Sequence, residues 1–174
     1  MSQRSIESFV SQHYAFVWRI VRGLGLTPSD AEDAAQQVLM IATRKLDGIA
    51  EDRERSFLYG VAVRVANNAR RSVRRRREVP EDDSDTAPSS DQSPEQRSEL
   101  TNARALLHDL MGQMPEKLRR VLLLAEVEEL ELRAIADLEG IPHGTAASRL
   151  RLARERFKKL LLAENHRNPY AREA

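Results

Sequence analysis

The stretch that decides the fold covers residues 131–157 and reads "ELRAIADLEGIPHGTAASRLRLARERF". Its first part has the apolar spacing of a short helix, and Gly140 suits the left-handed backbone that ends such a helix. The segment "IPHGT" then turns the chain, and Thr145 is predicted to cap a second helix that carries many arginines. Two helices joined by a tight turn, the second of them basic, indicate a helix-turn-helix that directs its second helix into a DNA major groove.

The formal net charge of +1 conceals three blocks of opposite sign. Residues 64–77 contain seven arginines and no acid, residues 78–99 contain eight acids and one arginine, and residues 142–160 contain six cations and one acid. Basic segments in both halves of the chain favour a nucleic acid as the ligand, because cations attract phosphate whatever the base sequence.

The acidic block at 78–99 holds three prolines and almost no apolar residue, so it cannot bury enough surface to offset the entropy of ordering. We therefore expect a flexible linker there. It divides the chain into a domain at 1–77 and a second domain at 100–166, followed by a tail at 167–174. The predicted fold class is all-α, with two small helical domains joined by the flexible acidic linker and a helix-turn-helix in the second.

Apolar residues at three- and four-residue steps locate the helices, and the aromatic content of 5% also favours helices over a strand-rich fold. Thr27 is the predicted cap of the second helix, with Pro28 in its first turn. Predicted helices cover residues 6–24, residues 27–42, a segment from about 55 into the arginine run, about 94–112, a segment from 115, and the two of the opening stretch.

Enzymatic chemistry is not expected from this sequence. The chain has no cysteine, which excludes disulfides, thiolate zinc sites and a cysteine nucleophile. Its four histidines lack metal-ligand spacing, and no glycine-rich phosphate loop or nucleophile elbow occurs. We predict no catalytic residue, metal or cofactor. The absence of a long apolar run or a signal peptide further predicts a soluble, cytoplasmic protein without membrane insertion.

Three segments resemble, in order, both characteristic regions of the extracytoplasmic-function sigma factors, a group of the sigma-70 family. They are "DAEDAAQQVLMIATRKL" at 30–46, "FLYGVAVRVANNARRSVRRRR" at 57–77 and "MPEKLRRVLLLAEVEELELRAIADLEGIPHGTAASRLRLARERF" at 114–157. The resemblance covers nearly the whole chain and implies an alternative sigma factor that binds core RNA polymerase and directs it to promoter DNA. The first half would recognise and open the minus-ten element, and the second half would read the minus-thirty-five element.

The second predicted helix exposes a polar face opposite its apolar stripe, which suits a protein partner better than DNA. The resemblance names that partner as the clamp helices of the polymerase. The polymerase-binding residues carried over are Asp30, Asp33, Gln36 and Gln37. The minus-ten residues are Arg64, Asn67, Asn68, Arg70, Arg71 and Arg74, and the minus-thirty-five residues are Thr145, Ser148, Arg149, Arg151 and Arg154.

The loop at 47–56 lies where this family captures an unstacked base of the opened strand, and Tyr59 is a candidate to stack on it. On the last helix, Leu150, Phe157 and Leu161 are expected to face the core. Three departures from the family pattern fall at the predicted DNA-facing positions: Arg64 stands where asparagine is usual, and Ala147 and Leu152 replace cations. The promoter sequence therefore cannot be transferred from relatives.

Two other interpretations stay open at this point. One is a helix-turn-helix transcription regulator that does not join polymerase, and the other is a basic interaction module that binds no specific DNA. The first half discriminates between a sigma factor and a plain regulator, because a plain regulator has no use for the polar helix at 30–46 followed by an arginine-rich helix. An anti-sigma protein is a further candidate partner.

Overall fold

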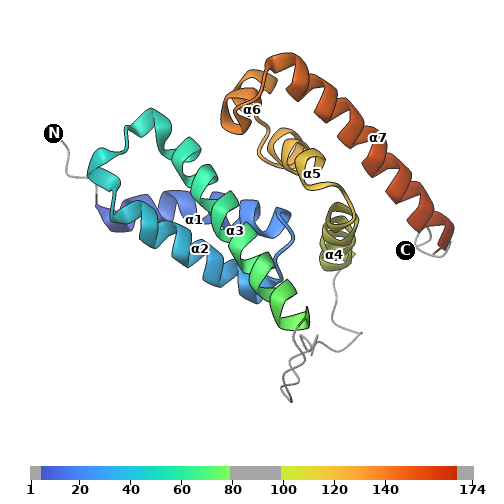
Figure 1. Cartoon of the computed structure of the whole chain (residues 1–174), viewed down its shortest axis with the longest axis horizontal. Helices are drawn as coiled ribbons and strands as arrows, with labels where there is room; N and C mark the ends of the chain where they lie inside the picture. The colour runs from blue at the N-terminus through green and yellow to red at the C-terminus, as the bar shows by residue number, and fades with distance from the viewer. Residues whose placement is uncertain (1–4, 79–98, 168–174) are drawn as a thin grey trace.

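The computed structural model describes residues 5–78 and 99–167, and every regular element in these two ranges is helical. This confirms the all-α prediction (Figure 1). Apart from Glu78 and Glu99, the predicted linker lies outside the described residues, as do residues 94–98 of the predicted fourth helix. The helices are α1 (Ile6–Gly23), α2 (Pro28–Thr43), α3 (Glu54–Glu78), α4 (Glu99–Gly112), α5 (Glu116–Leu122), α6 (Leu132–Glu139) and α7 (His143–Arg167).

The first half is a three-helix unit in which α1, α2 and α3 pack together. Their apolar stripes meet at fully buried side chains such as Val17, Val38 and Leu58. Each such burial contributes about 1.5–3 kcal/mol relative to exposure. Ile6 belongs to the apolar residues at helical spacing in α1 but is 58% exposed. It is the first residue of α1 and projects beyond the packed part of the unit.

The start of α2 follows the predicted capping chemistry. The Thr27 hydroxyl accepts a hydrogen bond from the Asp30 backbone N–H at 3.2 Å and donates one to the Asp30 carboxylate at 2.7 Å. Pro28 occupies the first turn, where its missing N–H costs nothing. The preceding turn passes through Gly25, whose φ of 98° is accessible to glycine at little cost.

The second half contains α4 to α7, with α5 continuing through a π-helical segment, Leu123–Val127. Helix α7 packs along α5, and its small residues Ala146 and Ala153 are fully buried, which allows the two helices to approach closely. Among the described residues, none of the helices is long and apolar enough to cross a membrane.

The two halves are not separate bodies but lie against each other, as Figure 1 shows for α1 and α3 beside α4 to α6. One hydrophobic cluster contains buried residues of both, including Leu123, Leu124 and Ile135 of the second half. Leu123 packs onto Gly23 of α1 so closely that a Cβ on that glycine would lie 2.6 Å from its methyl carbons. A side chain at position 23 would therefore require Leu123 to shift.

Candidate nucleic-acid interface

Helices α6 and α7 form the predicted helix-turn-helix. Gly140 adopts the left-handed conformation with φ 62°, and the next N–H, of Ile141, bonds to the Ala136 carbonyl at 3.0 Å. This pattern closes α6 in the way expected of a glycine cap. The prediction that Thr145 caps α7 is wrong, because the helix begins two residues earlier at His143. The Pro142 carbonyl accepts from the Thr145 N–H at 2.9 Å, so Thr145 already lies in the first turn.

One face of α7 is buried and the opposite face is open. Leu150 and Phe157 are partly buried beside the core, as predicted. Leu161 was also predicted to face the core, but it is 36% exposed because it lines an open cavity between α4 and α7. Ser148 and Arg151 are exposed on the outer face. This face is the only part of α7 that the rest of the second half leaves free for a groove, among the residues described.

The predicted minus-thirty-five residues do not all lie on that outer face. Arg149 and Arg154 are five positions apart, which places them roughly 140° apart around the helix, on opposite flanks. Arg154 bonds to Glu126 at 2.7–2.8 Å and stands at the rim of the cavity between α4 and α7. Arg151 pairs with Glu155 at 2.6 Å on the exposed face. Ser148 and Arg151 therefore share the outer face, while Arg149, roughly 160° around the helix from Arg151, and Arg154 lie on its two flanks.

Three of the predicted minus-ten residues lie on the side of α3 opposite its buried stripe of Leu58, Ala62, Val65 and Ala66. Arg64, Asn68 and Arg71 are all exposed and, at spacings of four and three, share one face. Asn67 is half-buried, and Arg70 faces the second half of the chain. There its guanidinium lies 3.4 Å from the Glu116 carboxylate. The side chain of Arg74 lies outside the described part of α3.

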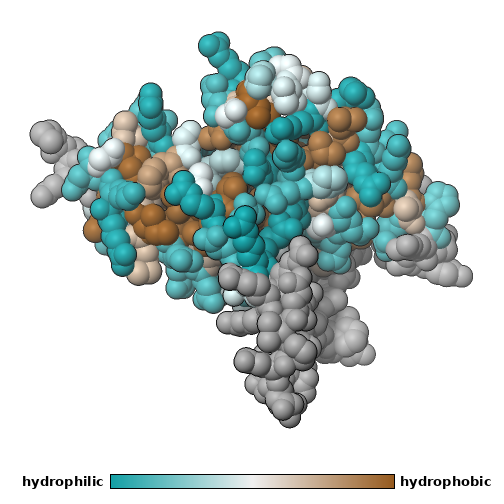
Figure 2. All heavy atoms as spheres, in the orientation of Figure 1, coloured by the Kyte–Doolittle hydropathy of each residue, from teal (hydrophilic) through white to brown (hydrophobic). Residues whose placement is uncertain are grey.

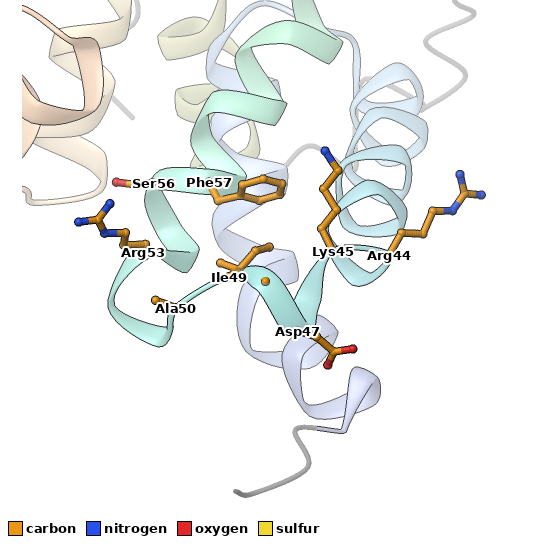
Figure 3. A pocket seen from close by; sticks show the side chains of 9 residues that line it. Arg44, Lys45, Asp47, Ile49, Ala50, Arg53, Ser56 and Phe57 are labelled. Atoms are coloured by element: carbon orange, nitrogen blue, oxygen red, sulfur yellow. The ribbon is translucent and has the colours of Figure 1, made fainter.

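A cavity of 680 Å³ opens at the loop where an unstacked base was predicted to bind. Two short 3₁₀ turns, Leu46–Gly48 and Glu51–Arg53, form the loop between α2 and α3. Figure 3 shows the Phe57 ring directed toward the Lys45 side chain across this space, while the Asp47 carboxylate points away. The lining residues are Arg44, Lys45, Asp47, Gly48, Ile49, Ala50, Arg53, Ser56 and Phe57.

Cations surround this cavity, and the sequence interpretation missed them. Arg44 and Lys45 directly follow α2 and Arg53 ends the second 3₁₀ turn, so the loop between α2 and α3 brings all three to the lining of one cavity. In Figure 2, apolar side chains also gather on the surface of the first half, between α2 and α3. A cavity lined by both apolar side chains and cations suits a nucleobase with its attached phosphate.

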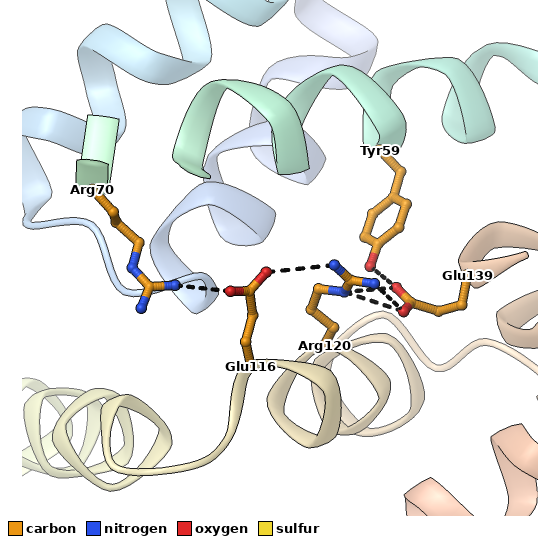
Figure 4. Close-up of polar contacts among 5 residues, drawn as sticks. All are labelled: Tyr59, Arg70, Glu116, Arg120 and Glu139. Carbon is orange, nitrogen blue, oxygen red and sulfur yellow. Dashed lines mark hydrogen bonds and ion pairs between the residues drawn. The ribbon is translucent and has the colours of Figure 1, made fainter. Parts of the chain in front are cut away.

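Tyr59, the residue predicted to stack on the base, does not line this cavity. Its side chain is buried, and its hydroxyl donates a hydrogen bond to Glu139 of the second half (Figure 4). Burial, followed by the neighbouring carboxylate, raises the pKa of Tyr59 well above its ordinary value. Position 59 lies on the face of α3 that meets α6, opposite the exposed arginines.

The predicted polymerase-binding residues Asp30, Asp33, Gln36 and Gln37 are all exposed on α2. They lie opposite the buried stripe of Ala31, Ala34, Ala35 and Val38. Asp30 is engaged in the cap with Thr27, which leaves the other three as the centre of the polar face. Met40 continues this face and is 56% exposed. The helical spacing could have revealed it, since position 40 follows Gln36 and Gln37 by four and three residues.

A second cavity, of 360 Å³, lies between α4 and α7 and was not foreseen. Its walls are mostly apolar, with Leu107, Met111 and Phe157 among them, and Arg154 and Lys158 contribute cations. Across the described residues, no cluster of three or more histidine, aspartate or glutamate side chains is arranged to hold a metal ion.

Comparison with known proteins places both halves in one family. Residues 9–77 match the family model Sigma-70 region 2, and residues 104–157 match Sigma-70, region 4. The RNA polymerase sigma-H factor of Pseudomonas aeruginosa is 33% identical over 143 residues, which cover 76% of this chain and 73% of that protein. The RNA polymerase sigma-E factor of Streptomyces avermitilis is 31% identical over 157 residues, with coverages of 89% and 84%.

A third relative is the ECF RNA polymerase sigma factor SigE of Mycolicibacterium smegmatis, at 26% identity, where the match covers 90% of this chain but 62% of that longer protein.

Among solved structures, the sigma factor RpoE in complex with the anti-sigma factor NepR from Bartonella quintana has a TM-score of 0.67 at 19% identity, with 89% of this chain and 95% of that chain covered. CnrH in complex with the cytosolic domain of CnrY has a TM-score of 0.66 at 21% identity, with 93% and 90% covered. These two likenesses concern the fold. Taken with the region matches and the two relatives above 30% identity, they lead to one conclusion: the chain belongs to the extracytoplasmic-function group of the sigma-70 family.

Proposed function

We propose that this chain, an alternative sigma factor that directs promoter-specific transcription initiation, divides its work among three exposed helix faces. The polar face of α2 binds core RNA polymerase, the cationic face of α3 binds the minus-ten element, and the outer face of α7 reads the minus-thirty-five element. The observation that carries this proposal is the presence of all three faces on one chain whose two halves match region 2 and region 4. We assign residues 1–77 and 100–166 to these two units.

The polymerase surface is defined here as Asp33, Gln36, Gln37 and Met40 of α2. Methionine is enriched in protein interfaces relative to the rest of the protein surface, because its flexible apolar side chain is well suited to being covered by a partner. Met40 supplies the apolar centre of this surface, and the glutamines supply hydrogen bonds around it. The absence of cations among these four residues favours a protein over DNA as the occupant.

The minus-ten element is proposed to use two neighbouring features. Arg64 and Arg71 attract the phosphates along α3, and the cavity beside Phe57 holds one base of the opened strand. Unstacking a base costs a few kcal/mol, and stacking on an aromatic ring returns about 1–3 kcal/mol. Lys45 and Arg53 add phosphate attraction at the edge of the same cavity. The pocket and the cations together can therefore offset the cost of opening.

The minus-thirty-five element is proposed to contact Arg149, Ser148 and Arg151 on α7. The buried alanines on the other side of α7 hold it close to α5, so its outer face stands clear of the rest of the second half. Arg154 is assigned to the rim of the neighbouring cavity instead, because Glu126 already pairs with it there. This assignment departs from the set expected from the sequence.

A protein with this role works where the polymerase is, so we propose the cytoplasm as its location. An anti-sigma protein is proposed as a further partner, supported by the two structural neighbours, whose structures are complexes with such inhibitors or with a cytosolic domain. The role requires no reaction chemistry from the chain itself.

Run-off transcription with bacterial core polymerase tests the proposal. Purified chain should form a complex with core polymerase and yield transcripts from a subset of promoters of its source genome. Replacing Gln36, Gln37 and Met40 together by alanine should abolish complex formation, while Glu7→Ala, an exposed position on α1, should leave it unchanged. Binding to promoter fragments without polymerase, combined with no transcript in its presence, would instead identify a helix-turn-helix regulator.

A further inference from the structure

One exposed leucine on α7 contributes neither to the core nor to the cationic surfaces. Leu152 is 43% exposed and belongs to neither hydrophobic cluster of the described residues, whereas Leu150, two positions earlier, packs against both. Single exposed leucines are common on protein surfaces and need no special role. Leu152, however, lies on the face of α7 that is proposed to read DNA, so its chemistry bears on which bases are read.

The position of Leu152 is defined by its neighbours on the helix. Leu152 and Ser148 are four positions apart, so they are separated by only about 40° around the helix, and their Cβ atoms lie roughly 5–6 Å apart. Ala146 and Ala153, which are fully buried, lie about 100° or more from either of them. Leu152 and Ser148 therefore occupy the outer face together, within the first three turns of α7.

This part of the outer face carries no free cation among the described residues. Arg151 lies beside Leu152, but its guanidinium pairs with Glu155 at 2.6 Å. At position 152 the family pattern has a cation, and this chain has leucine. Arginine or lysine selects guanine by donating to its N7 and O6 atoms. Leucine has no donor, so position 152 lacks the group that would select guanine.

The Ser148 hydroxyl is restricted to one hydrogen-bonding role. It donates its proton to the Gly144 carbonyl at 2.9 Å, so its oxygen can only accept from a base. In the major groove, adenine and cytosine present amino donors, whereas guanine presents only the acceptors N7 and O6. Ser148 in this state therefore suits adenine or cytosine and is unfavourable beside guanine.

A leucine can recognise one base through its C5-methyl group. In the major groove, thymine is identified by this methyl group next to its O4 acceptor. Covering the methyl group with an exposed leucine removes apolar area of both partners from water. An A·T pair presents the thymine methyl group and the adenine amino group together, so it can satisfy both Leu152 and Ser148.

We infer that Leu152 and Ser148 make the outer face of α7 selective for A·T base pairs. The leucine covers a thymine methyl group, and the serine oxygen accepts a hydrogen bond from an adenine amino group. The inference rests on the proposed function of α7 and names the bases that it reads. Base pairs follow one another at about 3.4 Å, so the roughly 5–6 Å between the two Cβ atoms spans one pair or two adjacent pairs.

Deoxyuridine tests the leucine contact, because it lacks the thymine methyl group and keeps the other major-groove groups. Holoenzyme formed from the full chain and core polymerase first selects promoter fragments from the source genome, and footprinting locates the upstream element. Each thymine of that element is then replaced singly by deoxyuridine, on either strand. At one or two positions the affinity should fall about fourfold, the effect expected when one methyl group is no longer buried.

Variants of the exposed leucines assign this effect to one side chain. Leu152→Ala should abolish the response to deoxyuridine at those positions, since protein and DNA then lack the two halves of one contact. Leu162→Ala is the matched control, because Leu162 is also exposed on α7, at 46%, but lies about 15 Å further along the helix. It should keep the full response. Leu152→Arg should shift the selected pair at that position from A·T to G·C.

The serine contact is tested in the same way. Replacing adenine by purine removes the amino group, and the resulting loss of affinity should be smaller in Ser148→Ala than in wild type. Equal losses in the two proteins would remove Ser148 from the assignment.

Three results would overturn the assignment of Leu152. They are binding that is indifferent to every thymine methyl group, an equal response to deoxyuridine in Leu152→Ala and wild type, and selected sequences that Leu152→Arg leaves unchanged. A chain that binds DNA and responds to the methyl group, but yields no transcript with core polymerase, would overturn the proposed function and support this inference. Transcription that is insensitive to every methyl group would do the reverse, and a chain that binds no DNA would overturn both.

Discussion

The two basic helices differ in what holds their arginines. On α7, Arg151 and Arg154 pair with Glu155 and Glu126, which belong to the same half of the chain. On α3, Arg70 pairs with Glu116, which belongs to the other half. The exposed i,i+4 pair on α7 is worth only a few tenths of a kcal/mol and can exchange for a phosphate at little cost.

This difference gives the two DNA-binding surfaces different dependence on the arrangement of the halves. The outer face of α7 is free whether or not the two halves lie against each other. The Arg70 side of α3 becomes free only when the second half moves away. On the proposed assignment, contact with the minus-thirty-five element therefore involves one helix face alone, while the contact of Arg70 with the minus-ten element depends on the position of the second half.

The largest effect is expected from removing a base-facing arginine of α7. Arg149→Ala should reduce transcription from promoters with a matched minus-thirty-five element. The variant should lose about 1–3 kcal/mol of discrimination between matched and mismatched elements, because one side chain is proposed to read base edges there. Polymerase binding should be retained. Footprinting at matched salt measures the loss of upstream protection, and Lys158→Ala, on the cavity side of α7, serves as the control. Intact upstream protection in Arg149→Ala would assign base reading to another residue.

A steric change should open the halves without altering any charge. In Gly23→Ala the new methyl group would lie 2.6 Å from Leu123, and forcing a group into a filled interface costs about 1–3 kcal/mol. The distance between the halves, measured by energy transfer between two attached dyes, should lengthen and the melting temperature should fall. Leu123→Ala in the same chain should restore part of both. If Gly23→Ala has the melting temperature and the distance between halves of wild type, the close contact between Gly23 and Leu123 does not affect stability.

Two neighbouring arginines on α3 should differ in the free protein. Arg71→Ala should lower the salt dependence of binding to single-stranded minus-ten DNA by about 0.7 units of slope, the value for one phosphate contact. Arg70→Ala should have a smaller effect, because Glu116 already occupies that side chain. In a Glu116→Gln background the two substitutions should become equal. Equal slopes without that change would show that the acid does not compete with DNA.

The smallest effect concerns pH. Burial, and then the charge of Arg22, lowers the pKa of His108 below 6.5, although Asp109 and a backbone bond to Arg22 oppose the shift, and Arg119 adds to it. An unfolded or open chain then binds the proton more tightly than the closed chain. Stability should therefore decline as pH falls through about 6.5. Thermal melts at pH 5.5 and 7.5 should show a smaller difference for His108→Gln than for wild type.

Much of the fold followed from local sequence signals. Thr27 before Pro28, and Gly140 after an apolar-periodic segment, act through bonds within a few residues of themselves, so their roles were predictable. The cap assigned to Thr145 failed for a local reason as well. The Pro142 carbonyl starts α7 earlier than a side-chain cap would, and nothing in the residue types alone distinguishes the two starts.

Site residues were predictable where helical periodicity sufficed and not where distant segments meet. The exposure of Asp33, Gln36 and Gln37 follows from the alanine stripe opposite them. The contact of Tyr59 with Glu139 was not predictable because the two residues are 80 positions apart in the chain. The pairing of Arg154 with Glu126 was not predictable either, because it depends on how α7 lies beside the end of α5.

The sequence by itself determined the helical class, the helix-turn-helix and the polar and cationic helix faces, because spacing along a helix and capping chemistry are short-range properties. Only the tertiary structure decided that Glu116, Glu128 and Glu139 meet cations and a hydroxyl of the other half, and that Arg44, Lys45, Arg53 and Phe57 surround one cavity. The acid contacts join residues far apart in the chain, and the cavity residues, although near one another in sequence, are brought together by the loop between α2 and α3. Their geometry is set by how apolar surfaces of several helices pack together, which no local pattern encodes.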